Sequence, residues 1–212
     1  MRRLVLLLLV AIPASAQGPP SILERGEVQV ERSAAAATQR LRLTLAYFKD
    51  GGWTREEIVA ATAQSAAILG QCGVALARIE LVLIDAEERF RDFFTPVSRE
   101  LARVLALDKP TVYFVSGTRQ RPAFDAEAIG RGNSRSRPEL SDTVWVTRGT
   151  RDLGIVLAHE LAHVLMDSGE HVDDPGNLMR ENTAPQNTQL SDAQCARLRD
   201  TGTANGLLKA PG

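Results

Sequence analysis

The feature that most constrains this chain is the placement of its histidines. All three histidines of the 212-residue sequence lie in one short segment, at His159, His163 and His171. The first two begin and end the sequence His159-Glu160-Leu161-Ala162-His163, which has the pattern H-E-x-x-H. On a helix, positions i and i+4 lie about 40° apart around the axis and about 6 Å apart along it, so two imidazoles can bind one metal ion. The pattern therefore predicts a zinc site with His159 and His163 as ligands and Glu160 as the base that activates water.

The residues around this motif predict a helix that presents one polar face. Apolar side chains recur across residues 153–165 with a period of 3.6, which is typical of a helix packed on a core. The two histidines project away from that stripe, toward a cleft, and Glu160 lies at the border between the faces. We expect Thr150 to be the N-cap and Asp152 to lie in the first turn.

His171 is the predicted third ligand. On a continuing helix it would lie about 12 Å beyond His163 along the axis, too far to share a metal. The sequence Asp167-Ser168-Gly169 predicts a chain reversal, with Gly169 available for a left-handed C-terminal cap. A third nitrogen ligand would leave the fourth zinc position open to water, as in catalytic sites. In the alternative, His171 is a loop histidine, and the third ligand is one of four nearby carboxylates: Asp167, Glu170, Asp173 or Asp174.

This set of motifs resembles the metzincin superfamily of zinc endopeptidases. In that family the H-E-x-x-H helix ends at a glycine, a third ligand follows, and a turn containing methionine passes beneath the metal. The resemblance implies that Met179, which follows the turn sequence Pro175-Gly176, is the Met-turn residue; the alternative is an ordinary core methionine. The chain departs from the family pattern twice, because His171 follows His163 by eight residues instead of six and Met166 replaces the glycine. The resemblance therefore implies a divergent member with a longer turn.

The N-terminal residues predict export. Residues 1–16 have a basic start, an apolar run at 4–12 and the cleavage pattern Ala14-Ser15-Ala16, as in a signal peptide. The apolar run is too short for a stable membrane anchor, although an uncleaved anchor is the alternative. We expect a periplasmic or secreted protein in which polar, alanine-rich residues 17–39 form a loosely held leader or linker and residues 40–212 form one catalytic domain.

Apolar periodicity in the mature chain predicts an α+β or α/β fold with a mixed sheet. The resemblance to metzincins implies a mostly parallel, twisted sheet with a metal-bearing helix, a Met-turn and a C-terminal helix. Capping boxes predict helix starts at Thr54, with Glu57, and at Ser191, with Gln194. The predicted strands are 41–48, 79–84, 111–115 and 143–147, with an edge strand at 128–132 inside a long loop at 118–142; the predicted helices are 54–69, 98–107, the metal helix and the helix that begins at Ser191.

Cysteine content and net charge limit the partners. Cys72 and Cys195 are the only cysteines, and an even pair in an exported protein predicts a disulfide; two buried free thiols are the alternative. The formal charge of −1 becomes −3 when Arg2 and Arg3 are removed with the signal peptide, which argues against a nucleic-acid partner. We expect a monomer with no stable membrane anchor.

The predicted function is that of an exported zinc-dependent endopeptidase acting on protein or peptide substrates. Three neutral imidazoles leave the positive charge on Zn²⁺, which lowers the pKa of water at the metal to ~7. Two alternatives are a zinc hydrolase of a non-protein amide in the cell envelope and a catalytically silent zinc-binding module. Glu160 argues against the silent module, because a purely structural site does not need that carboxylate.

Overall fold

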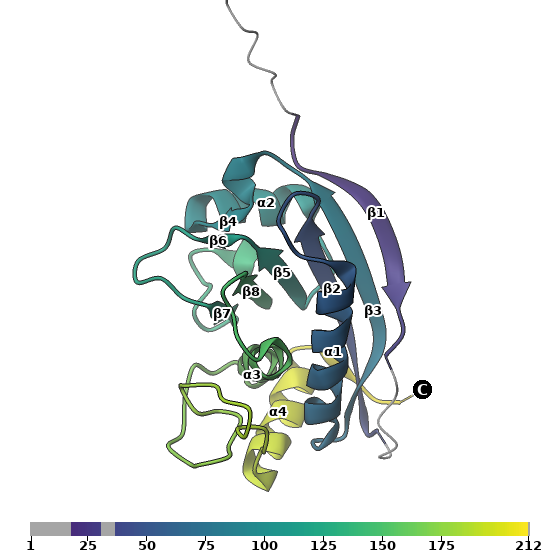
Figure 1. The fold of residues 1–212 in the computed structure, drawn as a ribbon. Coiled ribbons are helices and arrows are strands. Elements are labelled where there is room, and N and C mark those ends of the chain that lie inside the picture. Colours follow the sequence, from purple (N-terminus) through teal and green to yellow (C-terminus); the bar gives the residue numbers. More distant parts are fainter. Residues whose placement is uncertain (1–17, 31–36, 212) are drawn as a thin grey trace, which may run out of the picture.

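A twisted, mostly parallel sheet lies between helices on its two faces (Figure 1). The structure is a computed structural model that describes residues 18–30 and 37–211. The predicted signal peptide, residues 1–16, lies outside the described residues. Among the residues that the structure describes, no helix is both long and apolar enough to cross a membrane.

The central strands of the sheet are parallel and its outer strands are antiparallel. The order is β1-β3-β2-β5-β8-β7, and the short β9 pairs with β2. Strands β3, β2, β5 and β8 run in the same direction, whereas β1, β7 and β9 run against their neighbours. The strands are β1 (Ser21–Val28), β2 (Gln39–Phe48), β3 (Val74–Asp85), β5 (Thr111–Val115), β7 (Ala126–Ile129), β8 (Thr143–Thr147) and β9 (Leu208–Lys209).

Burial on both faces explains why the sequence forms a parallel centre. Every residue of β5 and β8 is buried, as expected for strands covered by helices on two sides. On β2, Leu41, Leu43 and Leu45 pack into one core, and Ala46 and Phe48 pack into the core on the opposite face.

Three helices cover one face of the sheet and one helix covers part of the other. Helices α1 (Arg55–Gly70), α3 (Leu153–Met166) and α4 (Asp192–Ala204) share a core with the first face, whereas α2 (Thr95–Leu105) packs on the second. The 3₁₀ turns η1 (Glu88–Phe90) and η2 (Pro138–Leu140) and the small sheet of β4 (Asp92–Phe93) with β6 (Gly117–Thr118) complete the second layer. In Figure 1, α3 lies beside α1 and α4, below the ends of β8 and β7.

The predicted fold class and most predicted elements are confirmed. The strands at 111–115 and 143–147 have the predicted bounds, and both capping boxes are present, at Thr54 and at Ser191. The strand predicted at 79–84 is longer, and the helix predicted at 98–107 begins three residues earlier and ends at Leu105. The edge strand predicted at 128–132 is β7, shifted toward the N-terminus.

Part of residues 17–39, the segment expected to be a loosely held leader or linker, is a strand of the sheet. Residues Ser21–Val28 form β1, which pairs antiparallel with β3 at the edge of the sheet. Its side chains are mostly exposed or half-buried, so the apolar alternation that marks a strand is missing. Backbone pairing with β3 holds this strand instead.

A disulfide links the two halves of the domain. It joins Cys72, just after α1, to Cys195 in α4, with a sequence separation of 123 residues and Cα atoms 4.8 Å apart. The disulfide therefore connects the end of α1 to α4, on the face of the sheet that α3 also covers.

Candidate metal centre

The three histidines converge on one point. Nε2 of His163 lies 2.9 Å from Nε2 of His159 and 3.2 Å from Nε2 of His171, and the third pair is 3.3 Å apart. His159 and His163 come from successive turns of α3, and His171 comes from the segment after it. Four bonds of ~2.0–2.1 Å in a tetrahedral zinc site separate the ligand nitrogens by roughly 3.3 Å, which is close to this triangle. The cluster could therefore hold a metal ion.

Hydrogen bonds at the other ring nitrogens fix which atoms face the cluster. Nδ1 of His159 lies 2.6 Å from the Leu178 carbonyl, and Nδ1 of His163 lies 2.6 Å from the Ser168 carbonyl. A carbonyl oxygen only accepts, so each Nδ1 carries the proton and each neutral ring presents an unprotonated Nε2. Lone pairs this close repel unless a cation lies between them. This donor set fits a metal that prefers imidazole, such as zinc.

Burial keeps the imidazoles of α3 neutral. It is the main cause that lowers the pKa of His163 to about 4, and the neighbouring rings of His159 and His171 add to the effect. Burial likewise lowers the pKa of His159. Both rings are therefore in the neutral form at pH 7, which is the form that binds metal ions.

Asp152 and Asp167 cap the two ends of α3, where the sequence had predicted Thr150 and Gly169. Asp152 is the N-cap, in a left-handed conformation with φ of 50°, and the Thr150 hydroxyl donates to the Asp125 carbonyl instead of capping the helix. At the other end, Asp167 takes the left-handed C-cap with φ of 46° that was predicted for Gly169. Asp is among the few residues besides glycine that tolerate this conformation.

The Asp167 side chain also ties the end of α3 to the loop after β7. Its carboxylate accepts a hydrogen bond of 3.0 Å from the Gly132 backbone N–H. Gly130 comes so close that a Cβ there would lie 2.6 Å from the same carboxylate. The chain then reverses, and His171 returns to the face of α3 that carries His159 and His163.

The carboxylates considered as alternative third ligands have other partners or lie apart. Asp167 binds the Gly132 amide, Glu170 pairs with Arg197 at 2.6 Å, and Asp173 pairs with Arg180 at 3.0 Å. Among the described residues, the cluster with metal-ligand geometry contains the three histidines and no carboxylate.

The segment that contains Met179 holds His159 through a backbone carbonyl. Leu178 supplies the carbonyl that holds His159, and Met179 beside it is 1% exposed. The Asn177 side chain accepts from the Met179 backbone N–H at 2.9 Å and exchanges hydrogen bonds with Gln194, which completes the capping box of α4. This amide pair, with Asn177 buried and Gln194 half-buried, is a positioning device that the sequence patterns did not indicate. A Pro-Gly turn followed by Asn gives no sign of a partner in a distant helix.

Glu160 lies beside the cluster, at its predicted place in the motif. It is 9% exposed, and the nearby Ala128 backbone N–H of β7 favours its charged form. Burial, and after it the nearby Glu127 carboxylate, raises the pKa of Glu160 to about 8. A cation held by the histidines would favour the charged carboxylate and oppose this shift.

Two cavities meet at Glu160 and extend on either side of the histidines. One, of about 500 Å³, lies between β7, its following loop and the histidines, and the other, of about 600 Å³, extends past the N-terminal end of α3. His159, Glu160 and Glu181 line both cavities. Two further carboxylates, Glu127 and Glu181, thus face the site; Glu127 was missed because it belongs to a short strand inside a polar loop.

The comparisons with known proteins agree with this architecture. No protein-family model and no curated protein sequence matches the chain. The crystal structure of metalloproteinase-II from Bacteroides fragilis is similar, with a TM-score of 0.53 and 19% sequence identity. The match covers 82% of this chain and 56% of that chain, so this chain spans little more than half of the larger protein. At this identity the likeness shows a metalloproteinase-like fold.

Proposed function

We propose that this protein is a zinc-dependent endopeptidase of metzincin type. The observation that carries the proposal is the triangle of Nε2 atoms, 2.9–3.3 Å apart, with a buried carboxylate next to it. His159, His163 and His171 would hold the ion, and Met179 would form the base of the site as the Met-turn residue. When bound, zinc would polarise the substrate carbonyl and lower the pKa of water.

Glu160 would move the proton. Its carboxylate accepts a proton from the attacking water and returns it to the amine that leaves. The Ala128 backbone N–H favours the charged carboxylate, and burial limits its contact with bulk solvent. The carbonyls of Leu178 and Ser168 keep two imidazoles in the tautomer that can bind metal.

The shape of the cleft favours a chain cleaved at an internal bond. Cavities on both sides of Glu160 give room for substrate residues before and after the scissile bond. Strand β7 ends the sheet order, and Ala126, Glu127 and Ala128 line the cavity beside the histidines. An extended peptide could add to this edge by main-chain hydrogen bonds.

The test is Glu160→Gln in the purified mature chain. The variant should keep its zinc and lose at least about a hundredfold in peptide hydrolysis, because an amide cannot take up and return the proton. Cleavage would be measured on a peptide library and, in parallel, on cell-envelope amides. Turnover within a few-fold of the unsubstituted protein would show that another group is the base. Cleavage of envelope amides alone would replace the endopeptidase proposal with the hydrolase alternative.

We further propose that the protein acts as a monomer after export, in the periplasm or outside the cell. The signal-peptide pattern of residues 1–16 supports export, and a disulfide between Cys72 and Cys195 suits an oxidising compartment. N-terminal sequencing of exported protein should start at Gln17, and a start at Met1 would contradict cleavage.

A further inference from the structure

The sheet face opposite α3 is only partly covered. Helix α2 packs over the half of this face that holds Phe48, Tyr113 and Trp145. The N-terminal half of β2 places Arg40, Arg42 and Thr44 on the same face, because side chains alternate along a strand and Leu41, Leu43 and Leu45 point into the other core. An open floor of polar side chains results, on the face of the sheet away from the histidines.

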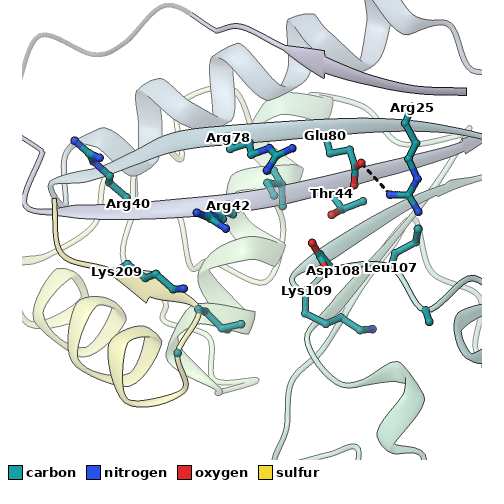
Figure 2. Close-up of a pocket in the computed structure, with 14 residues that line it drawn as sticks. Arg25, Arg40, Arg42, Thr44, Arg78, Glu80, Leu107, Asp108, Lys109 and Lys209 are labelled. Carbon is teal, nitrogen blue, oxygen red and sulfur yellow. Dashed lines mark hydrogen bonds and ion pairs between the residues drawn. The ribbon is translucent and has the colours of Figure 1, made fainter. Parts of the chain in front are cut away.

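This floor belongs to a basic pocket of about 320 Å³ (Figure 2). Its walls come from the segment after α2, at residues 106–109, and from the turn that leads into β9, at residues 206–209. The charged lining residues are six basic ones, Arg25, Arg40, Arg42, Arg78, Lys109 and Lys209, and two acidic ones, Glu80 and Asp108. The pocket therefore carries a net charge of about +4, while the whole chain has −1. The positive charge is concentrated here and does not reflect the composition of the chain.

Most of these cations have no acidic partner. Arg25 pairs with Glu80 at 2.9 Å, and the Lys109 ammonium donates to the Glu139 carbonyl at 3.1 Å. The other four, Arg40, Arg42, Arg78 and Lys209, form no ion pair with any residue that the structure describes.

The cations are also set close together by the sheet itself. Arg42 and Arg78 are register partners on the neighbouring strands β2 and β3, and Arg40 and Lys209 are register partners on β2 and β9. Like charges at directly opposite positions of a sheet destabilise it. A bound anion would relieve this repulsion.

Thr44 adds a neutral donor at the floor of the pocket. It is 3% exposed and lines the pocket, and its hydroxyl makes no hydrogen bond within the described part of the chain. In Figure 2 its side chain lies between Arg25, Glu80 and Asp108, below Arg78. A hydroxyl that lines the pocket in this way can donate a hydrogen bond to a ligand held there.

We propose that this basic pocket binds a phosphate group. Guanidinium groups bind phosphate through paired, charge-assisted hydrogen bonds, and a hydroxyl can donate to a third oxygen. The volume is at the lower end for ligand pockets, which suits a small phosphate-bearing ligand or a lipid headgroup. The site is separate from the histidine cluster, so this inference does not depend on hydrolytic activity.

The test is titration of the full mature protein with inorganic phosphate, measured by calorimetry against a chloride control of equal ionic strength. Arg42→Gln and Arg78→Gln should each weaken binding by about tenfold or more, and the double variant should abolish it. Thr44→Val keeps the shape and β-propensity of the side chain and should weaken binding by about tenfold. Zinc content and the thermal unfolding midpoint would check that each variant is folded.

Arg135→Gln is the matched control, because Arg135 is exposed, carries the same charge and does not line the pocket. It should leave phosphate binding unchanged. A second arm measures sedimentation with vesicles of phosphatidylcholine containing phosphatidic acid. Binding to these vesicles that is lost in Arg42→Gln assigns the phosphate to a lipid, and binding to inorganic phosphate alone assigns it to a soluble ligand. No binding in either arm, or equal losses in Arg135→Gln and Arg42→Gln, would overturn the proposal.

Discussion

At His159 and His163, a hydrogen bond at one ring nitrogen determines what the other can do. Each Nδ1 is held by a backbone carbonyl, and the unprotonated Nε2 then points into the cluster. His171 differs, because it is exposed and comes from a loop that is held by a hydrogen bond from the Val172 backbone N–H to the Met179 carbonyl. His171 is therefore the histidine of the cluster whose placement depends most on the surrounding chain.

Replacing His171 by Ala should weaken zinc binding by well over tenfold, because it removes one of three protein ligands. Chelator competition at fixed pH would measure this, since protonation of imidazole competes with metal binding. Asp173→Asn is the control, since that carboxylate is 94% exposed and pairs with Arg180. A variant at Asp173 or Asp174 that loses zinc while His171→Ala keeps it would assign the third ligand to a carboxylate.

At the scale of elements, the C-terminal end of α3 determines where His171 lies. Asp167 both ends the helix in a left-handed conformation and binds the Gly132 amide. Asp167→Ala should lower the free energy of unfolding by about 1–3 kcal/mol, because alanine disfavours this conformation and the hydrogen bond is lost. Asp167→Asn keeps both features and should change it much less. Urea unfolding would measure both variants, and equal effects would contradict this role for Asp167.

Most of the elements could be predicted from the sequence, because each has a local signal such as an apolar run or a capping box. Strands β5 and β8 are apolar runs with clear limits, and α1 and α4 begin at capping boxes. Strand β1 could not be predicted, since its pairing with β3 depends on backbone hydrogen bonds and its side chains are mostly polar. The caps of α3 were misplaced because Asp167 and Asp152 hold a left-handed conformation that composition does not reveal.

The candidate site likewise contains residues that a local motif indicated and residues that no local motif indicated. The H-E-x-x-H spacing indicated three of its residues directly, and the three histidines do converge. Glu127 and the Asn177–Gln194 pair were not indicated, because tertiary packing brings them to the site from separate elements. The basic pocket was also not indicated, since its residues come from strands that are distant in sequence and the net charge of the chain is near zero.

At the scale of the whole molecule, the disulfide closes a loop that contains most of the domain. Linking Cys72 to Cys195 across 123 residues restricts the unfolded chain far more than the folded one. The double variant Cys72→Ala, Cys195→Ala should lose about 5 kcal/mol of unfolding free energy by the loop-closure relation. Zinc content should stay unchanged, because neither cysteine touches the histidines. Denaturant unfolding of both proteins under oxidising conditions would measure the loss, and equal midpoints would contradict it.

The most direct test of the metal centre is the zinc content of the purified mature protein and of its His163→Ala variant, measured by elemental analysis after dialysis. His163 has the shortest distances to the other two nitrogens, 2.9 and 3.2 Å, so its loss opens the cluster at its centre. The metal centre described above predicts about one zinc per chain in the unsubstituted protein and almost none in the variant. A protein without zinc, or a His163→Ala variant that keeps a full equivalent, would contradict it.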